Sequence, residues 1–144
     1  MIKKAQMQDL PDLGKLAAML WPYHTAQEMA AELASVVDEE DGACFLAYDG
    51  VMPMGFAQCQ LRRDYVEGTE TSPVGYLEGI YVAEECRKKG IAGALLGACE
   101  SWAREKGCAE FASDCELENA QSLRFHLSMG FEEANRIICF TKKL

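Results

Sequence analysis

A strand that leads through a glycine-containing turn into a helix is the segment that most restricts how this chain can fold. The strand is predicted over residues 75–82 (GYLEGIYV), the turn over 87–90 (RKKG), and the helix from Ile91 to a C-cap at Gly107. Gly79 within the strand indicates a β-bulge or a close backbone approach. The pattern therefore predicts a strand–turn–helix unit in the middle of the chain.

The start of this helix has the composition of an anion site. A helix that begins on such a turn leaves amide N–H groups without partners, and its dipole adds partial positive charge there. Lys88 and Lys89 would add point charges, so the turn favours a pyrophosphate. It has neither the G-x-x-x-x-G-K-[ST] nor the G-x-G-x-x-G spacing. The alternative is a helix start of small residues that packs closely on the sheet.

Helices and strands are also predicted on both sides of this unit. Apolar spacing predicts helices from Asp9 to Leu20, from Thr25 to Val37 and over 118–129, with Asp9 and Thr25 as N-caps. The remaining predicted segments are strands over 44–48, 54–62 and 108–114, one or two strands in 131–144 (FEEANRIICFTKKL), and a long loop over 64–73. No linker or repeat interrupts the pattern, so one α+β domain over residues 1–144 is expected.

Composition excludes several classes of function. The 144 residues are 49% apolar and carry 23 acidic against 14 basic side chains, a net charge of −9. Nucleic acid and anionic membranes need a basic face, so neither is an expected partner, whereas a cationic substrate is compatible with this charge. No run of about 18 apolar residues predicts a membrane span, and no apolar run follows the N-terminal lysines to make a signal peptide.

The cysteines and histidines give no metal or disulfide pattern. Seven cysteines is an odd number and no pair has the C-x-x-C spacing, so reduced thiols in the cytoplasm are expected. Only two histidines are present, and neither lies in a ligand cluster, so no metal is expected. Buried, inert thiols are the expectation for all seven cysteines.

The turn and its surroundings resemble a known family. Arg87-x-x-Gly-x-Ala after a bulged strand resembles the acyl-CoA pyrophosphate loop of the Gcn5-related N-acetyltransferases (GNAT), and Asn119 and Met129-Gly130-Phe131 also fit. A narrower similarity is to the aminoglycoside 6′-N-acetyltransferases. It rests on six pieces in the right order: Leu20-Trp21-Pro22, Arg63-Asp64-Tyr65-Val66-x-Gly68, Ser72-Pro73, Leu77-Glu78-Gly79-Ile80, Ala112-Ser113-Asp114 and Gly130-Phe131-Glu132-Glu133.

The resemblance implies a fold, a reaction and a co-substrate site. The fold would be a central, mostly antiparallel sheet with a splayed, bulged fourth strand and about four helices. Acetyl-CoA would give its acetyl group to an amine by direct attack, without a covalent enzyme intermediate. Ile80, Tyr81 and Val82 would bind the pantetheine arm, an N–H near the bulge would polarise the thioester carbonyl, and the remaining co-substrate positions would be Arg87, Lys88, Lys89, Gly90, Ile91, Ala92, Gly93 and Asn119.

The same resemblance implies which residues meet the substrate. Glu78 and Asp114 are candidate catalytic carboxylates that hold the cationic amine and relay its proton. The alternative for Glu78 is a charge at the sheet edge that faces solvent. The alternative for Asp114 is a turn residue or a helix N-cap. Trp21 and Tyr65 would contact sugar rings, although Trp21 at a helix end also fits core packing. His126 stands where many relatives carry the tyrosine that reprotonates the CoA thiolate; the alternative is a packed helical histidine.

Asn135 departs from the implied pattern, because the nearest relatives are expected to carry an acid there that meets the substrate. Its amide can still accept a hydrogen bond but contributes no charge.

Three functions remain open at the level of sequence. The first is acetylation of the 6′-amine of an aminoglycoside, which confers antibiotic resistance. The second is acetylation of another amine, such as a polyamine or a peptide N-terminus, and the third is a non-catalytic acyl-CoA-binding module. The resemblance also implies a homodimer, since relatives are commonly dimers.

Overall fold

Short apolar strands and amphipathic helices alternate along the chain, and the computed structural model describes all of them over residues 1–144. The elements in chain order are β1 (Ile2–Lys4), the 3₁₀ turn η1 (Met7–Asp9), α1 (Leu10–Leu20), α2 (Ala26–Asp38), β2 (Gly42–Asp49), β3 (Met52–Arg62), β4 (Val74–Val82), the 3₁₀ turn η2 (Glu84–Cys86), α3 (Ile91–Glu105), β5 (Phe111–Ser113) and α4 (Ala120–Ser128). The sequence prediction placed every α-helix and every strand except β1, which is too short to show a periodicity.

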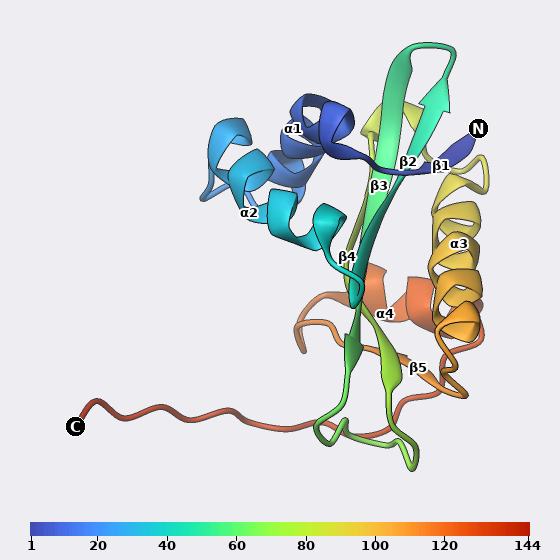
Figure 1. Ribbon diagram of the computed structural model, residues 1–144. Coiled ribbons are helices and arrows are strands. Elements are labelled where there is room, and N and C mark those ends of the chain that lie inside the picture. The colour runs from blue at the N-terminus through green and yellow to red at the C-terminus, as the bar shows by residue number, and fades with distance from the viewer.

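The five strands form one sheet in the order β1-β2-β3-β4-β5. Every neighbouring pair is antiparallel except β4 and β5, which run parallel. Helices α1 and α2 cover one face, and α3 covers the other (Figure 1). Apolar side chains fill both layers. Leu13 of α1, Leu33 of α2 and Phe56 of β3 are fully buried on one face of the sheet, and Leu95, Leu96 and Trp102 of α3 are buried on the other. The expected mostly antiparallel sheet is confirmed.

A β-bulge interrupts the pairing of β3 with β4. Gln58 lies opposite Gly79 and Cys59 lies opposite Leu77, so Glu78 is the extra residue with no partner in the register. A bulge changes the alternation of side chains between the two faces. The expected bulge is therefore present, and Glu78 is the residue it displaces.

Strands β4 and β5 separate soon after they meet. They pair at three positions only, the last of which joins Leu77 to Ser113. Beyond Leu77 no strand pairs with that side of β4, so the backbone of residues 78–82 has an open edge. This is the splayed fourth strand that the resemblance implied.

The predicted helix starts are confirmed, although one of the two caps works differently. Thr25 Oγ1 accepts a hydrogen bond from Glu28 N–H at 3.1 Å, as an N-cap should. Asp9 makes no such bond to α1: its Oδ2 accepts from Gln6 N–H at 2.8 Å and its Oδ1 accepts from Lys3 Nζ at 3.0 Å. The Asp9 carboxylate therefore ties the N-terminal segment to the start of α1.

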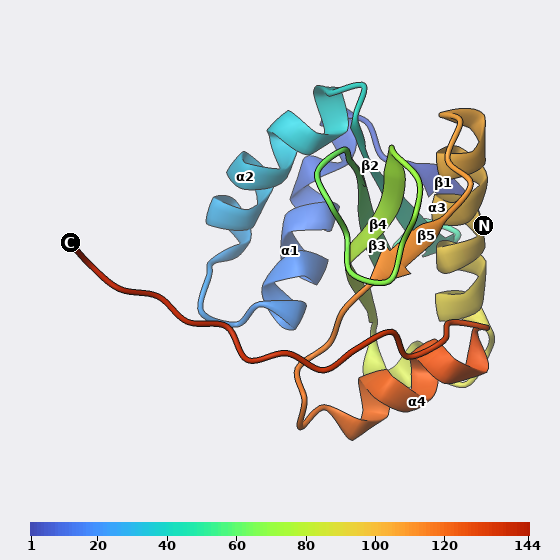
Figure 2. The same cartoon turned by 90° about the horizontal axis from the view of Figure 1, so that it is seen from below.

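The strands expected in residues 131–144 are absent, and that prediction is wrong for the single chain. This segment has no helix or strand and runs away from the domain beyond the side of α1 and α2 (Figures 1 and 2). A strand needs a neighbouring edge for its N–H and C=O groups, and the chain does not return to its own sheet. From Arg136 onward every residue is exposed.

No helix is long and apolar enough to cross a lipid bilayer.

Candidate functional site

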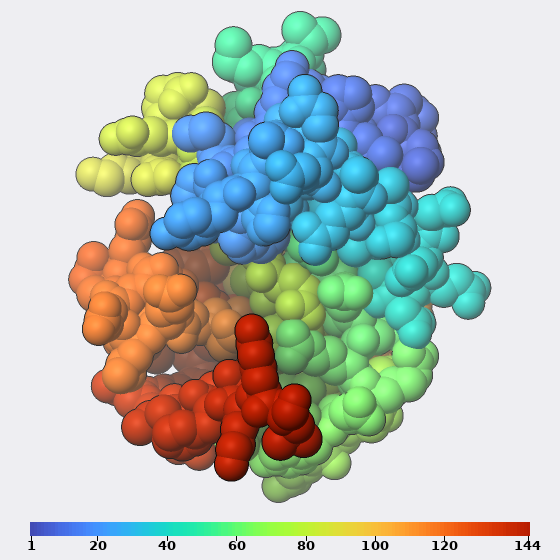
Figure 3. Space-filling view, turned by 90° about the vertical axis from the view of Figure 1, so that its left-hand side faces the viewer, coloured from blue at the N-terminus to red at the C-terminus, as the bar shows by residue number.

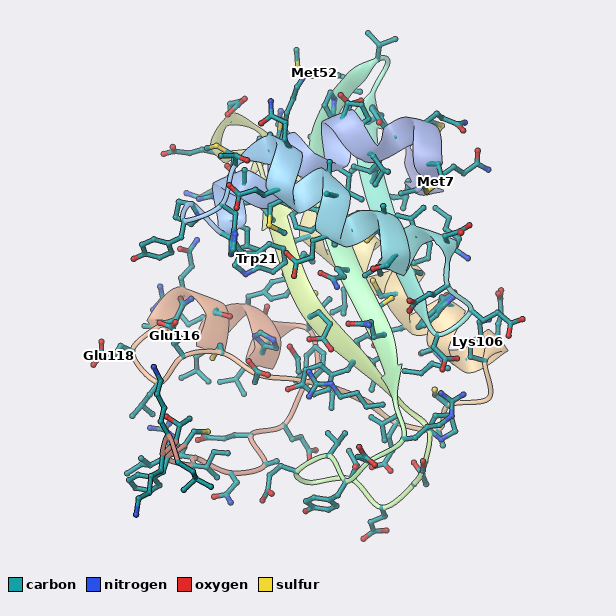
Figure 4. All side chains as sticks on the ribbon, turned by 60° about the vertical axis from the view of Figure 1, so that its left-hand side comes forward. Met7, Trp21, Met52, Lys106, Glu116 and Glu118 are labelled. Atoms are coloured by element: carbon teal, nitrogen blue, oxygen red, sulfur yellow. The ribbon has the colours of Figure 1, made fainter.

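The bulge turns Glu78 toward the face covered by α1 and α2. Gly79 also faces that side, because a Cβ at Gly79 would lie 2.7 Å from the ring of Trp21. Figure 4 shows Trp21 at the end of α1, between the helical layer and β4. Glu78 and Trp21 share a cavity of about 460 Å³, whose polar lining also includes His24, Glu32, Gln58 and Gln60. Two predicted substrate residues therefore meet in one cavity.

Asp114 follows directly on the last paired residue of β5, as Glu78 does on β4. The register joins Leu77 to Ser113, so the two carboxylates occupy the next position on each separating strand. The Tyr76 hydroxyl donates a hydrogen bond to Asp114 Oδ2. Burial and the neighbouring Asp114 raise the pKa of Tyr76, so the phenol remains a proton donor. The structure thus gives corresponding positions on two neighbouring strands to two carboxylates that lie 36 residues apart in sequence.

Arg62 at the end of β3 holds Glu78. Its Nε and Nη2 donate to Glu78 Oε1 at 3.1 and 2.9 Å, and Nη2 also donates to Oε2 at 3.0 Å. The guanidinium carbon lies 3.5 Å from the centre of the Tyr76 ring. The sequence prediction assigned no role to Arg62 or Tyr76. The spacing of Gln58, Gln60 and Arg62, every second residue along β3, was the available signal, because such residues share one face of a strand.

His126 lies at the point where β4 and β5 separate. Its Nε2 is 2.8 Å from Ser113 Oγ, and Ser113 Oγ lies 3.3 Å from the carbonyl of Leu77. The other ring nitrogen, Nδ1, is 2.7 Å from the Ser122 carbonyl. A carbonyl only accepts, so Nδ1 is assigned the hydrogen and Nε2 is left to exchange a proton.

The turn before α3 has the backbone shape of an anion cradle. Lys88 and Gly90 have positive φ angles, 63° and 79°, and Gly90 is the N-cap of α3. The first intrahelical bond runs from Ala94 N–H to the Gly90 carbonyl, which leaves the amides of residues 91–93 free to face a ligand. Lys88 and Lys89 are exposed beside them.

Two predicted co-substrate residues make structural contacts of their own. Arg87 Nε donates to the Val82 carbonyl at 2.9 Å, and its guanidinium lies 5.6 Å from the centre of the Tyr81 ring. Asn119 Oδ1 accepts from Ser122 N–H at 3.0 Å and caps α4. Ile80, Tyr81 and Val82 pair with β3 along one edge only.

Tyr65 and Asn135 lie outside the cavity. Tyr65 is 77% exposed in the loop between β3 and β4. Asn135 Nδ2 donates to Glu67 Oε1 in the same loop at 2.9 Å. The loop itself is fixed to the sheet, because Glu110 accepts bonds from the backbone N–H groups of Glu70 and Thr71.

A space-filling view shows the resulting surface. Figure 3 shows a hollow bordered by α1 and α2 in blue, α4 in orange and the C-terminal segment in red, with strand atoms in green and yellow at its floor. No cluster of three or more His, Cys, Asp or Glu side chains that could hold a metal ion is present. Of the seven free cysteines, Cys108 is partly buried, and Cys115 and Cys139 are exposed, which corrects the expectation that all are buried.

Comparison with protein families agrees with this geometry. Residues 10–131 match the model of the acetyltransferase (GNAT) family. An aminoglycoside N(6′)-acetyltransferase type 1 from Stenotrophomonas maltophilia is 41% identical over 99% of this chain and 93% of its own length. A protein of the same name from Acinetobacter haemolyticus is 38% identical over 99% of this chain and 98% of its own length.

Solved structures show the same fold. The structure of AAC(6′)-Iy in complex with the bisubstrate analogue CoA-S-monomethyl-acetylneamine has a TM-score of 0.95 at 35% identity, covering 100% of this chain and 98% of that one. The aminoglycoside 6′-N-acetyltransferase AAC(6′)-Ig from Acinetobacter haemolyticus has a TM-score of 0.94 at 38% identity, covering 100% and 99%. The four helices and the open five-stranded mixed sheet described above are the fold of these structures.

Proposed function

Because the chain belongs to the acetyltransferase (GNAT) family, we propose that it acetylates the 6′-amine of an aminoglycoside in the cavity between α1, α2, β3 and β4, next to the point where β4 and β5 separate. The chain is an acetyl-CoA-dependent aminoglycoside acetyltransferase, since relatives 34–41% identical carry that name and a neighbouring structure holds CoA. The observation that carries the site assignment is the pair Glu78 and Asp114, each of which directly follows the last paired residue where β4 and β5 separate.

The acetyl-CoA would lie along the open side of β4. Ile80, Tyr81 and Val82 offer backbone groups to the pantetheine arm, and the free amides of residues 91–93 face the pyrophosphate. Lys88 and Lys89 supply positive charge at the same place. A backbone N–H near the bulge would polarise the thioester carbonyl in the manner of an oxyanion hole. The thioester carbon would then lie near the point where the strands separate.

The reaction needs an amine that has lost its proton. The 6′-ammonium would bind at Glu78 and release a proton to that carboxylate, directly or through water. The neutral nitrogen attacks the thioester carbon, the C–N bond forms, and the C–S bond breaks to give an N-protonated amide and a thiolate. The amide nitrogen then loses its extra proton to water. Asp114 would hold a neighbouring hydroxyl or ammonium of the substrate, and acetylation would remove the positive charge by which the antibiotic binds, conferring resistance.

His126 would return a proton to the CoA thiolate. Its Nδ1 is engaged with the Ser122 carbonyl, so the proton would leave from Nε2, the nitrogen that faces Ser113 and the open end of the paired strands. Neutral pH suits such an exchange by histidine. Trp21 would pack on a sugar ring inside the cavity, whereas Tyr65 and Asn135 would reach the substrate from the loop and from the segment that follows α4.

The proposed function is tested by comparing amines. Purified protein, acetyl-CoA and a thiol reagent are combined with kanamycin, tobramycin, spermidine or a peptide, and thiol release is followed. We expect turnover with the two aminoglycosides that exceeds turnover with spermidine or peptide by at least about a hundredfold. Mass spectrometry should place the acetyl group on the 6′-nitrogen. Turnover with spermidine or peptide and none with either aminoglycoside would contradict the proposal.

Replacing both lysines of the turn, Lys88→Ala with Lys89→Ala, should weaken acetyl-CoA binding. A charged group that contacts a phosphate contributes about 1.5–3 kcal/mol, so the KM for acetyl-CoA should rise by about tenfold or more. The kcat should remain within about twofold, because neither lysine touches the reacting atoms. Lys15→Ala on the exposed side of α1 is the matched control. An unchanged KM for acetyl-CoA in the double variant would remove the turn from the co-substrate site.

We also propose that the protein is a cytoplasmic homodimer in which the C-terminal arm, residues 136–144, adds to the sheet of a second copy. The arm exposes Ile137, Ile138 and Phe140 at 67, 80 and 88%. Such an apolar run is typical of a strand buried on both faces. The outer edge of β5 is the end of the sheet, and it can accept a further strand. The seven free thiols fit a reducing compartment.

A further inference from the structure

The side chain of Arg62 contacts one of the two carboxylates assigned to the substrate and the tyrosine that binds the other. It donates three hydrogen bonds to Glu78 at 2.9–3.1 Å. Its guanidinium also stacks on the ring of Tyr76, whose hydroxyl holds Asp114. One guanidinium is therefore in direct contact with Glu78 and is linked through Tyr76 to Asp114.

This arrangement depends on the shape of an arginine. The planar fork places two nitrogens on one carboxylate, and the flat face covers an aromatic ring at the same time. The Glu78 side chain is only 22% exposed, and the Arg62 side chain is 42% exposed. A lysine could supply the charge but neither the fork nor the stack. The contact therefore fixes the direction of the Glu78 carboxylate and also places a positive charge beside it.

A carboxylate that binds an ammonium also holds the proton on it. An unpaired negative charge beside the 6′-ammonium would raise the pKa of that amine, and each pKa unit lowers the reactive fraction about tenfold at pH values below the pKa. A cation in contact with the same carboxylate offsets this effect. The other charged or titratable groups near Glu78 are Glu32 and His24 across the cavity, the Tyr76 phenol, and Asp114 behind it.

The neighbouring Arg63 points elsewhere and pairs with Asp41 at the end of the α2–β2 connection. Arg62 is therefore the cation in contact with Glu78. Resting on the function proposed above, we propose that Arg62 is a positioning residue that directs the Glu78 carboxylate and offsets its charge, so that the bound 6′-ammonium releases its proton.

The experiment follows kcat for kanamycin between pH 5.5 and 9.5 at saturating acetyl-CoA. In Arg62→Gln, the pH at which kcat declines on the acid side of the profile (the acid limb) should rise by about one unit. At pH values below this limb, kcat should be about tenfold lower than in the wild type, and it should recover at high pH. The KM for kanamycin should fall or stay unchanged, because Glu78 then binds the cation with its full charge. Arg62→Lys keeps the charge and loses the fork, so its acid limb should stay in place while kcat falls at every pH.

Arg63→Gln is the matched control, an adjacent arginine that loses only its pair with Asp41, and its profile should overlay that of the wild type. Calorimetry of kanamycin binding in two buffers of different ionisation enthalpy gives a second readout that needs no turnover. Arg62→Gln should take up more protons on binding than the wild type does.

A uniform loss of kcat in Arg62→Gln with an unmoved acid limb and unchanged proton uptake would overturn this proposal and leave Arg62 a merely structural residue. Failure of the wild type to acetylate kanamycin would instead contradict the proposed function. The two outcomes are distinguishable because the first is seen only in an active wild-type enzyme.

Discussion

Glu78→Gln is expected to lower kcat for an aminoglycoside by about a hundredfold or more, while the KM for acetyl-CoA stays within about twofold. The amide keeps the size and position of the carboxylate but cannot accept the proton of the 6′-ammonium, and such proton transfer contributes about 10²–10⁴-fold. Glu78 faces the cavity of Trp21 and Gln58, whereas the free amides of the co-substrate turn belong to α3. Steady-state kinetics with each substrate varied in turn measures both constants.

Asp114→Asn should also lower turnover, because Asp114 directly follows the last paired residue of β5 as Glu78 follows the last paired residue of β4. Glu105→Gln is the control, an exposed acidic residue at the far end of α3 that changes the net charge by the same amount. Full activity in both Glu78→Gln and Asp114→Asn would remove these carboxylates from the mechanism. Equal losses in Glu105→Gln would show that net charge alone is responsible.

Removal of the C-terminal arm, residues 136–144, is expected to convert the proposed homodimer into a monomer. Burying Ile137, Ile138 and Phe140 against a second copy contributes about 1.5–3 kcal/mol for each side chain, less the cost of ordering the arm. A net loss of about 4 kcal/mol raises the dissociation constant about a thousandfold. Sedimentation equilibrium of the full chain and the truncated chain at micromolar concentration measures the change.

Two point variants separate the apolar contact from the length of the chain. Ile138→Asp and Phe140→Asp should each weaken the dimer, because a carboxylate replaces an apolar side chain in the interface. Lys142→Ala in the same arm should leave the protein sedimenting with the mass of a dimer. A full-length protein that sediments as a monomer, or a truncated protein that still sediments as a dimer, would contradict the proposed arrangement.

Local sequence signals predicted the parts of the fold that depend on a few neighbouring residues. Thr25 accepts from Glu28 N–H because a side-chain oxygen at an N-cap can reach an amide three residues ahead. Gly90 has a positive φ, which glycine adopts without strain, and α3 begins at Ile91 as predicted. In each case the interaction lies within one turn of the chain, and the residues that make it are adjacent in sequence.

The candidate site was predicted only as far as individual strands allow. Gly79 indicated a bulge, but the register with β3 decides that Glu78 is the extra residue and so which face it points to. The spacing of Gln58, Gln60 and Arg62 shows that these residues share a face of β3, but the contact of Arg62 with Glu78 and Tyr76 also depends on the register between two strands. Asp9 shows the same limit, since Lys3 and Gln6 N–H compete for the carboxylate that would otherwise cap α1.

The sequence by itself determined where most helices and strands begin and end, and the residue types that would meet an acyl-CoA and a cationic amine. Tertiary structure decided which of those residues share a cavity, because the register of β4 with β3 turns Glu78 toward Trp21 and Arg62. It also decided that the C-terminal run IICF at residues 137–140 forms no strand in the single chain. That run has the composition of a strand, but a strand forms only where another edge satisfies its backbone hydrogen bonds, and in the single chain the run does not return to an edge of its own sheet.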